Sequence, residues 1–311
     1  MKTQTTSICE FQTDTLEFRD VKEKDIPLLQ GYFNLYPQRS CDFSVGGVMM
    51  WIDYFEYKIA EAEDSLFITG RIPGTDTNVF YIPSGPIRPE RYIELISNYC
   101  EAQQIKGVLL IPEESTPEDE KFFVGTMDEY ADNWKEYLYD IDRFTGFSGR
   151  KMEKKRNHLN FFLNNYSPVQ IKEISSEDTA DLITFTLAFG MNHADSELAA
   201  YEINQVIKVL RNYDSYSFYG ILIKVDDKIA GYTFGEKSGD VFFVHVEKGD
   251  ISVRGIYQAL ASRLAIAVRE RFPEVMYLNR EEDMGAENLR ISKESYHPSR
   301  YVKKRIIKLL S

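Results

Sequence analysis

Hydrophobic residues recur along this chain at two periods, and the two periods alternate in the same order in both halves. In the first half, a strand at 16–21 is followed by helices at 24–36 and 44–55, strands at 57–62, 65–72 and 78–83, a helix at 90–104 and a strand at 107–112. The helical segments carry apolar residues three and four apart, as at Ile26, Leu29 and Phe33. The Pro73-Gly74 pair predicts a turn between the second and third of the three consecutive strands.

The second half repeats this order. It predicts helices at 177–190 and 197–211, strands at 218–225, 228–236 and 240–248, a helix at 255–272, a strand at 275–278 and a helix at 287–295. The long helix carries one apolar stripe, formed by Ile256, Leu260, Leu264 and Val268. The repeated order indicates an internal duplication with little residue identity. We therefore expect an α+β protein with two domains, 1–144 and 167–311, each a mixed and mostly antiparallel sheet flanked by helices.

The connector at 145–166 is rich in bases and is expected to be helical over its second part. Its cationic or titratable side chains are Arg150, Lys151, Lys154, Lys155, Arg156 and His158. Several of them fall three or four apart and so share one helical face, and the expected apolar face is formed by Leu159, Phe162 and Leu163. The basic face is either solvated or in contact with a phosphate or polyanion in a cleft between the domains, where Asn157 adds hydrogen-bonding capacity.

The charge distribution and the cysteine content argue against several classes of protein. The 311 residues carry a net charge of −12, distributed as −14 over residues 1–140 (12 bases, 26 acids) and +2 over 141–311 (25 bases, 23 acids). The acidic first half argues against wrapping of nucleic acid. Cys9, Cys41 and Cys100 form no metal-binding or disulfide pattern, so no metal is expected. With no apolar leader and no long apolar run, a cytoplasmic location is expected.

Residues 279–301 hold the strongest candidates for chemistry. Arg290 and Lys293 lie three apart, so both can face one anion from a short helix, and Tyr296 follows. The alternative is a pair of surface bases near a helix C-terminus. Asn279, Asp283, Gly285 and, upstream, Lys248 are further candidates for substrate contact.

Two other positions are open to two interpretations. His245, in the middle of a strand, is either a hydrogen-bonded core histidine or a catalytic base. Gly255 starts the long helix, where it either lets a phosphate approach backbone amides or serves as an ordinary cap.

Three segments carry a resemblance to a known family. GRKMEKKRNHLNFF, VHVEKGD with RGIYQAL, and LNREEDMGAENLRISKESYHP resemble an uncharacterised bacterial family allied to the C-terminal domain of phosphatidylglycerol lysyltransferases. That family is more distantly similar to Fem-type aminoacyltransferases. The resemblance implies two tandem GNAT-like domains. It also implies that the closing segment lines the acceptor side and that Lys293 stabilises charge near the transferring group.

The resemblance implies an acyl- or aminoacyltransferase that acts between the domains. Its donor would be aminoacyl-tRNA or, less favoured, an acyl-CoA, and its acceptor an amine or a phosphate-bearing molecule. Lys293 and Arg290 would stabilise an oxyanion, and Tyr296 or His245 would move a proton. Ser252 and Tyr257 depart from the acetyl-CoA-binding pattern.

The alternative is a non-catalytic module that binds a small molecule or phosphate on a degenerate GNAT scaffold. Contacts to tRNA would come from the basic connector and from the C-terminal bases Lys303, Lys304, Arg305 and Lys308. The sequence leaves the oligomeric state open.

Overall fold

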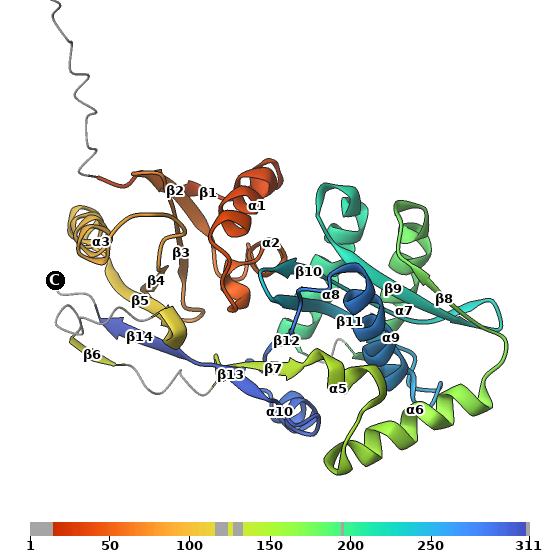
Figure 1. Cartoon of the computed structure of the whole chain (residues 1–311). Helices are drawn as coiled ribbons and strands as arrows, with labels where there is room; N and C mark the ends of the chain where they lie inside the picture. Colours follow the sequence, from red (N-terminus) through yellow and green to blue (C-terminus); the bar gives the residue numbers. More distant parts are fainter. Residues whose placement is uncertain (1–14, 116–123, 127–132, 194–195, 309–311) are drawn as a thin grey trace, which may run out of the picture.

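The computed structural model describes residues 15–115, 124–126, 133–193 and 196–308, which form two seven-stranded sheets side by side (Figure 1). The first sheet has the order β1-β2-β3-β4-β5-β14-β6. The elements of this half are β1 (Arg19–Asp20), α1 (Ile26–Leu35), α2 (Val45–Met50), β2 (Lys58–Ala62), β3 (Ser65–Arg71), β4 (Thr77–Tyr81), α3 (Pro89–Gln103), β5 (Lys106–Pro112) and β6 (Val124–Thr126). Its strands pair antiparallel except β4 with β5.

The second sheet has the order β13-β7-β12-β11-β10-β9-β8, with β11 and β12 parallel. Its elements begin with β7 (Glu136–Asp140), α5 (Ile141–Gly146), α6 (Glu153–Asn165), β8 (Val169–Glu173), α7 (Thr179–His193) and α8 (Glu197–Arg211). They continue with β9 (Tyr219–Val225), β10 (Lys228–Ser238), β11 (Val241–Gly249), α9 (Ile256–Arg271), β12 (Tyr277–Glu282), α10 (Glu287–Glu294), β13 (Arg300–Val302) and, back in the first sheet, β14 (Lys304–Lys308).

The predicted α+β class and the repeated order of elements are confirmed. Two helices, three antiparallel strands, a helix and a parallel strand occur in each half, as α1–β5 and as α7–β12. The predicted stripe of α9 faces the core, because Leu260, Leu264 and Val268 are all buried. Among the described residues, no helix combines the length and apolarity needed to cross a membrane.

The two halves exchange strands, which the predicted boundaries do not reflect. Strand β7 precedes the boundary after residue 144, yet it pairs with β12 of the second sheet. Strand β14 ends the chain and pairs with β5 of the first sheet, where the blue strand lies beside the yellow one in Figure 1. In each case the exchanged strand covers an edge that would otherwise present unpaired backbone groups. This pairing joins residues far apart in the chain, so local periodicity carries no signal for it.

Candidate functional site

A small pocket opens where the two sheets meet. It encloses about 70 Å³ and is lined from both sheets. Its acidic lining is Asp42, Glu281 and Glu282, and its aromatic lining is Trp51, Phe55, Tyr57, Tyr81 and Trp134. Glu281 and Glu282 end β12, whereas Asp42 and Trp51 flank α2. The sequence analysis did not select these residues; the acidic run directly after the apolar part of β12 was the available signal.

Lys304 is buried in a cluster of carboxylates beside this pocket. Its Nζ lies 2.7 Å from Asp42 and 2.9 Å from Glu136, and it also contacts Glu282. Burial raises the pKa of Glu282 to about 8 and also raises that of Asp42. Burial opposes the charge of Lys304, but the three carboxylates hold its pKa well above the usual value. The predicted contact of Lys304 with tRNA is therefore wrong for this conformation, because the ammonium is enclosed; Lys303 and Lys308 are exposed.

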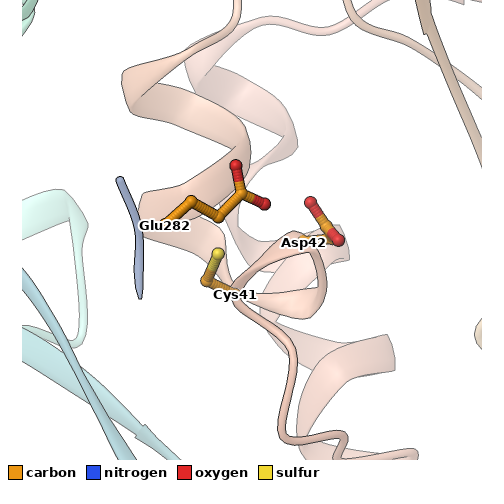
Figure 2. Close-up of side chains that lie close together, drawn as sticks. All are labelled: Cys41, Asp42 and Glu282. Carbon is orange, nitrogen blue, oxygen red and sulfur yellow. The ribbon is translucent and has the colours of Figure 1, made fainter. Parts of the chain in front are cut away.

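Cys41, Asp42 and Glu282 gather beside the same pocket (Figure 2). One potential ligand atom from each lies within 4.8 Å of the others. The Lys304 ammonium already binds both carboxylates, so it supplies the positive charge that a metal ion would otherwise supply. Burial also raises the pKa of the Cys41 thiol. The cluster is thus arranged as a lysine–carboxylate site.

His245 is fixed on both ring nitrogens. Nδ1 lies 2.6 Å from Glu281 and Nε2 lies 2.9 Å from Glu236, which also accepts the backbone N–H of Gly46. Burial works against the imidazolium, but the two carboxylates raise the pKa of His245 to about 9. With both nitrogens protonated and engaged, the ring has no position from which to accept a proton. This geometry fits a hydrogen-bonded core histidine better than a catalytic base.

Arg290 and Lys293 lie on α10 but turn to different partners. Arg290 forms a two-pronged ion pair with buried Asp283, with both N···O distances 2.9 Å. The Lys293 Nζ donates to the backbone carbonyls of Arg280, at 2.7 Å, and of Glu282. Burial lowers the pKa of Lys293 to about 8. The predicted convergence of both cations on one anion is therefore not present. Lys293 does not line the pocket itself, but it donates to the backbone carbonyl of Glu282, which does.

Asp283, Gly285 and Asn279 hold the backbone around this region. Asp283 accepts the Tyr137 hydroxyl and the Gly285 N–H in addition to Arg290, and Gly285 has a left-handed φ of 77°. Buried Asn279 donates to Glu136 and to the carbonyl of Arg39, which ties β12 to the first half of the chain. Their observed contacts are to the protein itself, so any contact with substrate stays a prediction.

Strands β11 and β12 diverge after Phe243, the last residue of their shared ladder. Two side-chain pairs bridge the gap: His245 with Glu281, and Arg280 with Glu247 at 2.6 Å. Buried Tyr296 lies beside the second pair, with the Arg280 guanidinium 4.9 Å from its ring centroid. The Tyr296 hydroxyl accepts a hydrogen bond from Gln258, and burial raises its pKa. Arg280 was not predicted from the sequence.

The connector helix α6 covers the start of α9. A Cβ on Gly255, whose φ is 89°, would lie 2.4 Å from the carbonyl oxygen of His158 on α6. The backbone N–H of Arg254 donates to the Tyr166 hydroxyl, and Tyr257 donates to the Gly249 carbonyl. The small size of Gly255 thus serves helix packing, and the amide nearest the predicted phosphate position is already engaged.

The remaining predicted contact residues lie apart from one another, and Lys248 is buried. Arg156 donates to the carbonyls of Phe147 and Gly149 and closes the loop before α6. Lys248 forms an ion pair with Glu202 at 2.6 Å. Among the connector residues predicted to bind substrate, those that are exposed are Arg150, Lys151, Lys154, Asn157 and His158. These five remain available for a polyanion, which the structure does not test.

Comparison with solved structures identifies proteins that share this fold. The structure is similar to that of a solved protein of unknown function from Bacteroides thetaiotaomicron, with a TM-score of 0.82 and 24% identity. The alignment covers 95% of this chain and 100% of the Bacteroides chain. The structure is also similar to the C-terminal domain of a putative lysylphosphatidylglycerol synthetase from Agrobacterium fabrum, with a TM-score of 0.65, 12% identity and coverage of 93% and 92%. The solved structure of FemX shares the fold at a TM-score of 0.57, 8% identity and coverage of 94% and 97%.

The match of the sequence to a family model decides the family. Residues 33–307, nearly the whole of the two-sheet body, match the model described as phosphatidylglycerol lysyltransferase, C-terminal. The resemblance inferred from the three sequence segments is confirmed, and the fold is shared with the solved synthetase C-terminal domain and with FemX. The chain belongs to the family of phosphatidylglycerol lysyltransferase C-terminal domains.

Proposed function

We propose that this protein transfers an aminoacyl group from aminoacyl-tRNA to an amine or hydroxyl of an acceptor, at the pocket between the two sheets. Membership of the family supports aminoacyl transfer as the class of reaction. The observation that carries the proposal is the position of Lys293. Its ammonium is held at the end of β12, on the carbonyl of Glu282, which itself lines the pocket.

The pocket lining matches an aminoacyl group. An aminoacyl ester carries an α-ammonium, which carboxylates attract and aromatic faces stabilise. Glu281 and Asp42 supply the carboxylates, and Trp51, Tyr57 and Tyr81 supply rings. Because Lys304 and His245 already neutralise part of this acidic charge, the ligand needs only a modest positive charge to be bound.

The transfer reaction develops negative charge on the oxygen of the ester carbonyl. The acceptor nucleophile attacks the ester carbonyl, a new C–N or C–O bond forms, and the bond to the tRNA ribose breaks. The acceptor loses its proton and the ribose hydroxyl gains one. With a pKa of about 8, Lys293 is mostly protonated at pH 7, so its ammonium can stabilise the oxyanion of the tetrahedral intermediate. Its partners are neutral carbonyls, which leaves that charge uncompensated by direct ion pairing.

An acyl-CoA donor has less support. The loop before α9, where a pyrophosphate would lie against backbone amides, is covered by α6 at Gly255. We expect calorimetric titration with acetyl-CoA to show no binding tighter than about 1 mM, a free energy of about −4 kcal/mol. A micromolar dissociation constant for acetyl-CoA would instead support an acyl-CoA as the donor.

The test is a transfer assay with radiolabelled aminoacyl-tRNA. Phosphatidylglycerol vesicles and small amines serve as separate acceptor arms, and labelled product is counted against spontaneous hydrolysis. Lys293→Ala is expected to lower kcat by about 10²-fold or more, as for loss of one oxyanion-stabilising group. Lys24→Ala, at an exposed lysine outside the basic connector and the C-terminal bases, is the control and should retain activity.

Two outcomes would count against the proposal. Equal turnover by the wild type and Lys293→Ala would remove this residue from the mechanism. Saturable binding of aminoacyl-tRNA or a small ligand with no transfer to any acceptor would favour the non-catalytic binding module instead.

A further inference from the structure

A second cluster of charges lies at the gap between β11 and β12, beside the connector helix. Arg280 uses Nη2 to bind Glu247 at 2.6 Å, while its Nη1 is buried and has no hydrogen-bond partner among the described residues. The Lys155 Nζ lies 3.7 Å from the centroid of Tyr296 and donates to Ser295 Oγ at 2.7 Å. Two cationic groups thus meet over one buried aromatic ring, and one guanidinium nitrogen is unsatisfied.

The local charge is unbalanced. Arg280, Lys155 and Lys293 contribute three positive charges against one carboxylate, Glu247, which gives +2 when all four are ionised. Burial lowers the pKa of Lys155 to about 8, and the charge of Arg280 lowers it further in the same direction. The other titratable groups that face these cations are Tyr139, Tyr296, Cys41, Glu281 and Glu282. Glu281 shares His245 with Glu236, and Glu282 shares Lys304 with Asp42 and Glu136, so these two carboxylates offset part of the positive charge from the side of the pocket.

We infer that Lys155 and Arg280 form a binding site for a phosphate group. An unsatisfied buried donor beside a second cation that is held only by a hydroxyl favours an oxyanion with several acceptor oxygens. The ammonium of Lys155 is held by one neutral hydroxyl, so it can turn from Ser295 to the ligand without breaking an ion pair. Tyr296 closes the site on its apolar side.

Neither Lys155 nor Arg280 lines the pocket at Asp42, although Lys293 contacts the Arg280 carbonyl between the two places, and phosphate binding here does not require aminoacyl transfer. The residues of the phosphate site come from α6, β12 and the segment after α10, whereas the pocket is lined by residues of the first sheet and the end of β12. Phosphate binding is therefore measured without any donor. Failure of that measurement would leave the transfer assay unaffected, and the reverse also holds.

The experiment titrates the full chain with inorganic phosphate at pH 7 and constant ionic strength, by calorimetry and by NMR of the lysine Nζ groups. Dimethyl phosphate, in a parallel arm, distinguishes a phosphodiester ligand from a free phosphate. Lys155→Gln should weaken binding by about tenfold or more, as for loss of a hydrogen bond to a charged group. Lys154→Gln, on the same helix but exposed, is the matched control and should bind as the wild type does.

Arg280→Lys keeps the charge but removes the second edge of the guanidinium, so it should also weaken binding. Each variant is first compared with the wild type by thermal unfolding, so that loss of binding is scored only in folded protein. Saturable binding of either phosphate that is lost in Lys155→Gln and kept in Lys154→Gln supports the site. No saturable binding of either phosphate to the wild type, or equal losses in the two lysine variants, would overturn it.

Discussion

Replacing Lys304 with alanine should destabilise the protein strongly, and more so as the pH rises. The side chain is 1% exposed and contacts three carboxylates, of Asp42, Glu136 and Glu282, which are themselves at most 14% exposed. Removing one partner of a buried ion pair leaves an uncompensated charge, at a cost of about 3–5 kcal/mol. We expect a loss in the free energy of unfolding of about this size at pH 8.

The pH dependence follows from the carboxylates that remain. In the wild type the folded-state pKa of Glu282 is about 8, above its ordinary value of 4.5. Its contribution to stability is therefore fully present below pH 4.5 and is lost as the pH rises through 8. The Lys304 ammonium lowers that pKa, so in Lys304→Ala the pKa should rise further and the decline in stability should be steeper. The loss at pH 5 should accordingly be smaller than the loss at pH 8.

Urea unfolding at pH 5 and pH 8, followed by tryptophan fluorescence, measures the free energy of unfolding of the wild type and of Lys304→Ala at each pH. Trp51 and Trp134 line the pocket next to the cluster and so report on this part of the structure. Lys303→Ala is the control; as an exposed residue it should change stability by less than about 0.5 kcal/mol. A loss below about 1 kcal/mol at pH 8, or an equal loss at both pH values, would refute the reasoning about a buried and charge-coupled cluster.

Three further predictions test the packing of the two halves. Gly255→Ala should cost about 1–3 kcal/mol of stability, measured by urea unfolding, because of its positive φ and the nearby His158 carbonyl; unchanged stability would mean that α6 does not press on this residue. His245 has a pKa of about 9 in the folded protein and an ordinary value of 6.5, so its imidazolium stabilises the fold fully below pH 6.5 and loses this contribution as the pH rises through 9. The difference in free energy of unfolding between the wild type and His245→Asn should therefore shrink over that range. Deleting residues 303–311 should expose β5 and speed its amide hydrogen exchange, and protection equal to that of the wild type would argue against the exchanged strand.

The periodicity of the chain determined most of the elements. The helices predicted at 90–104 and 197–211 match α3 and α8 within one residue at each end, because each has a full amphipathic repeat. The short strands β7, β8, β13 and β14 were not predicted. Local pattern carries little information in such short segments, and the sequence of β14, KRIIK, has no strict alternation of apolar and polar residues.

The sequence could also identify the family, because the three segments that carry the resemblance are local strings. It named Lys293 but could not say what Lys293 contacts. Helical spacing predicted that Arg290 and Lys293 bind one anion together, yet in the folded protein Arg290 forms an ion pair with Asp283. Spacing on a helix fixes which residues share a face, but the charge that each residue meets depends on the elements packed against that face.

The sequence by itself therefore determined the elements, their repeated order and the family. The tertiary structure alone decided that the two halves exchange strands and that Lys304 lies in a carboxylate cluster instead of on a basic tail. It also decided that His245 is held between Glu236 and Glu281. The physical reason is the same in each case. Strand pairing and burial bring together residues that lie up to hundreds of positions apart in the chain. A local sequence pattern contains no information about the free energy of such long-range contacts.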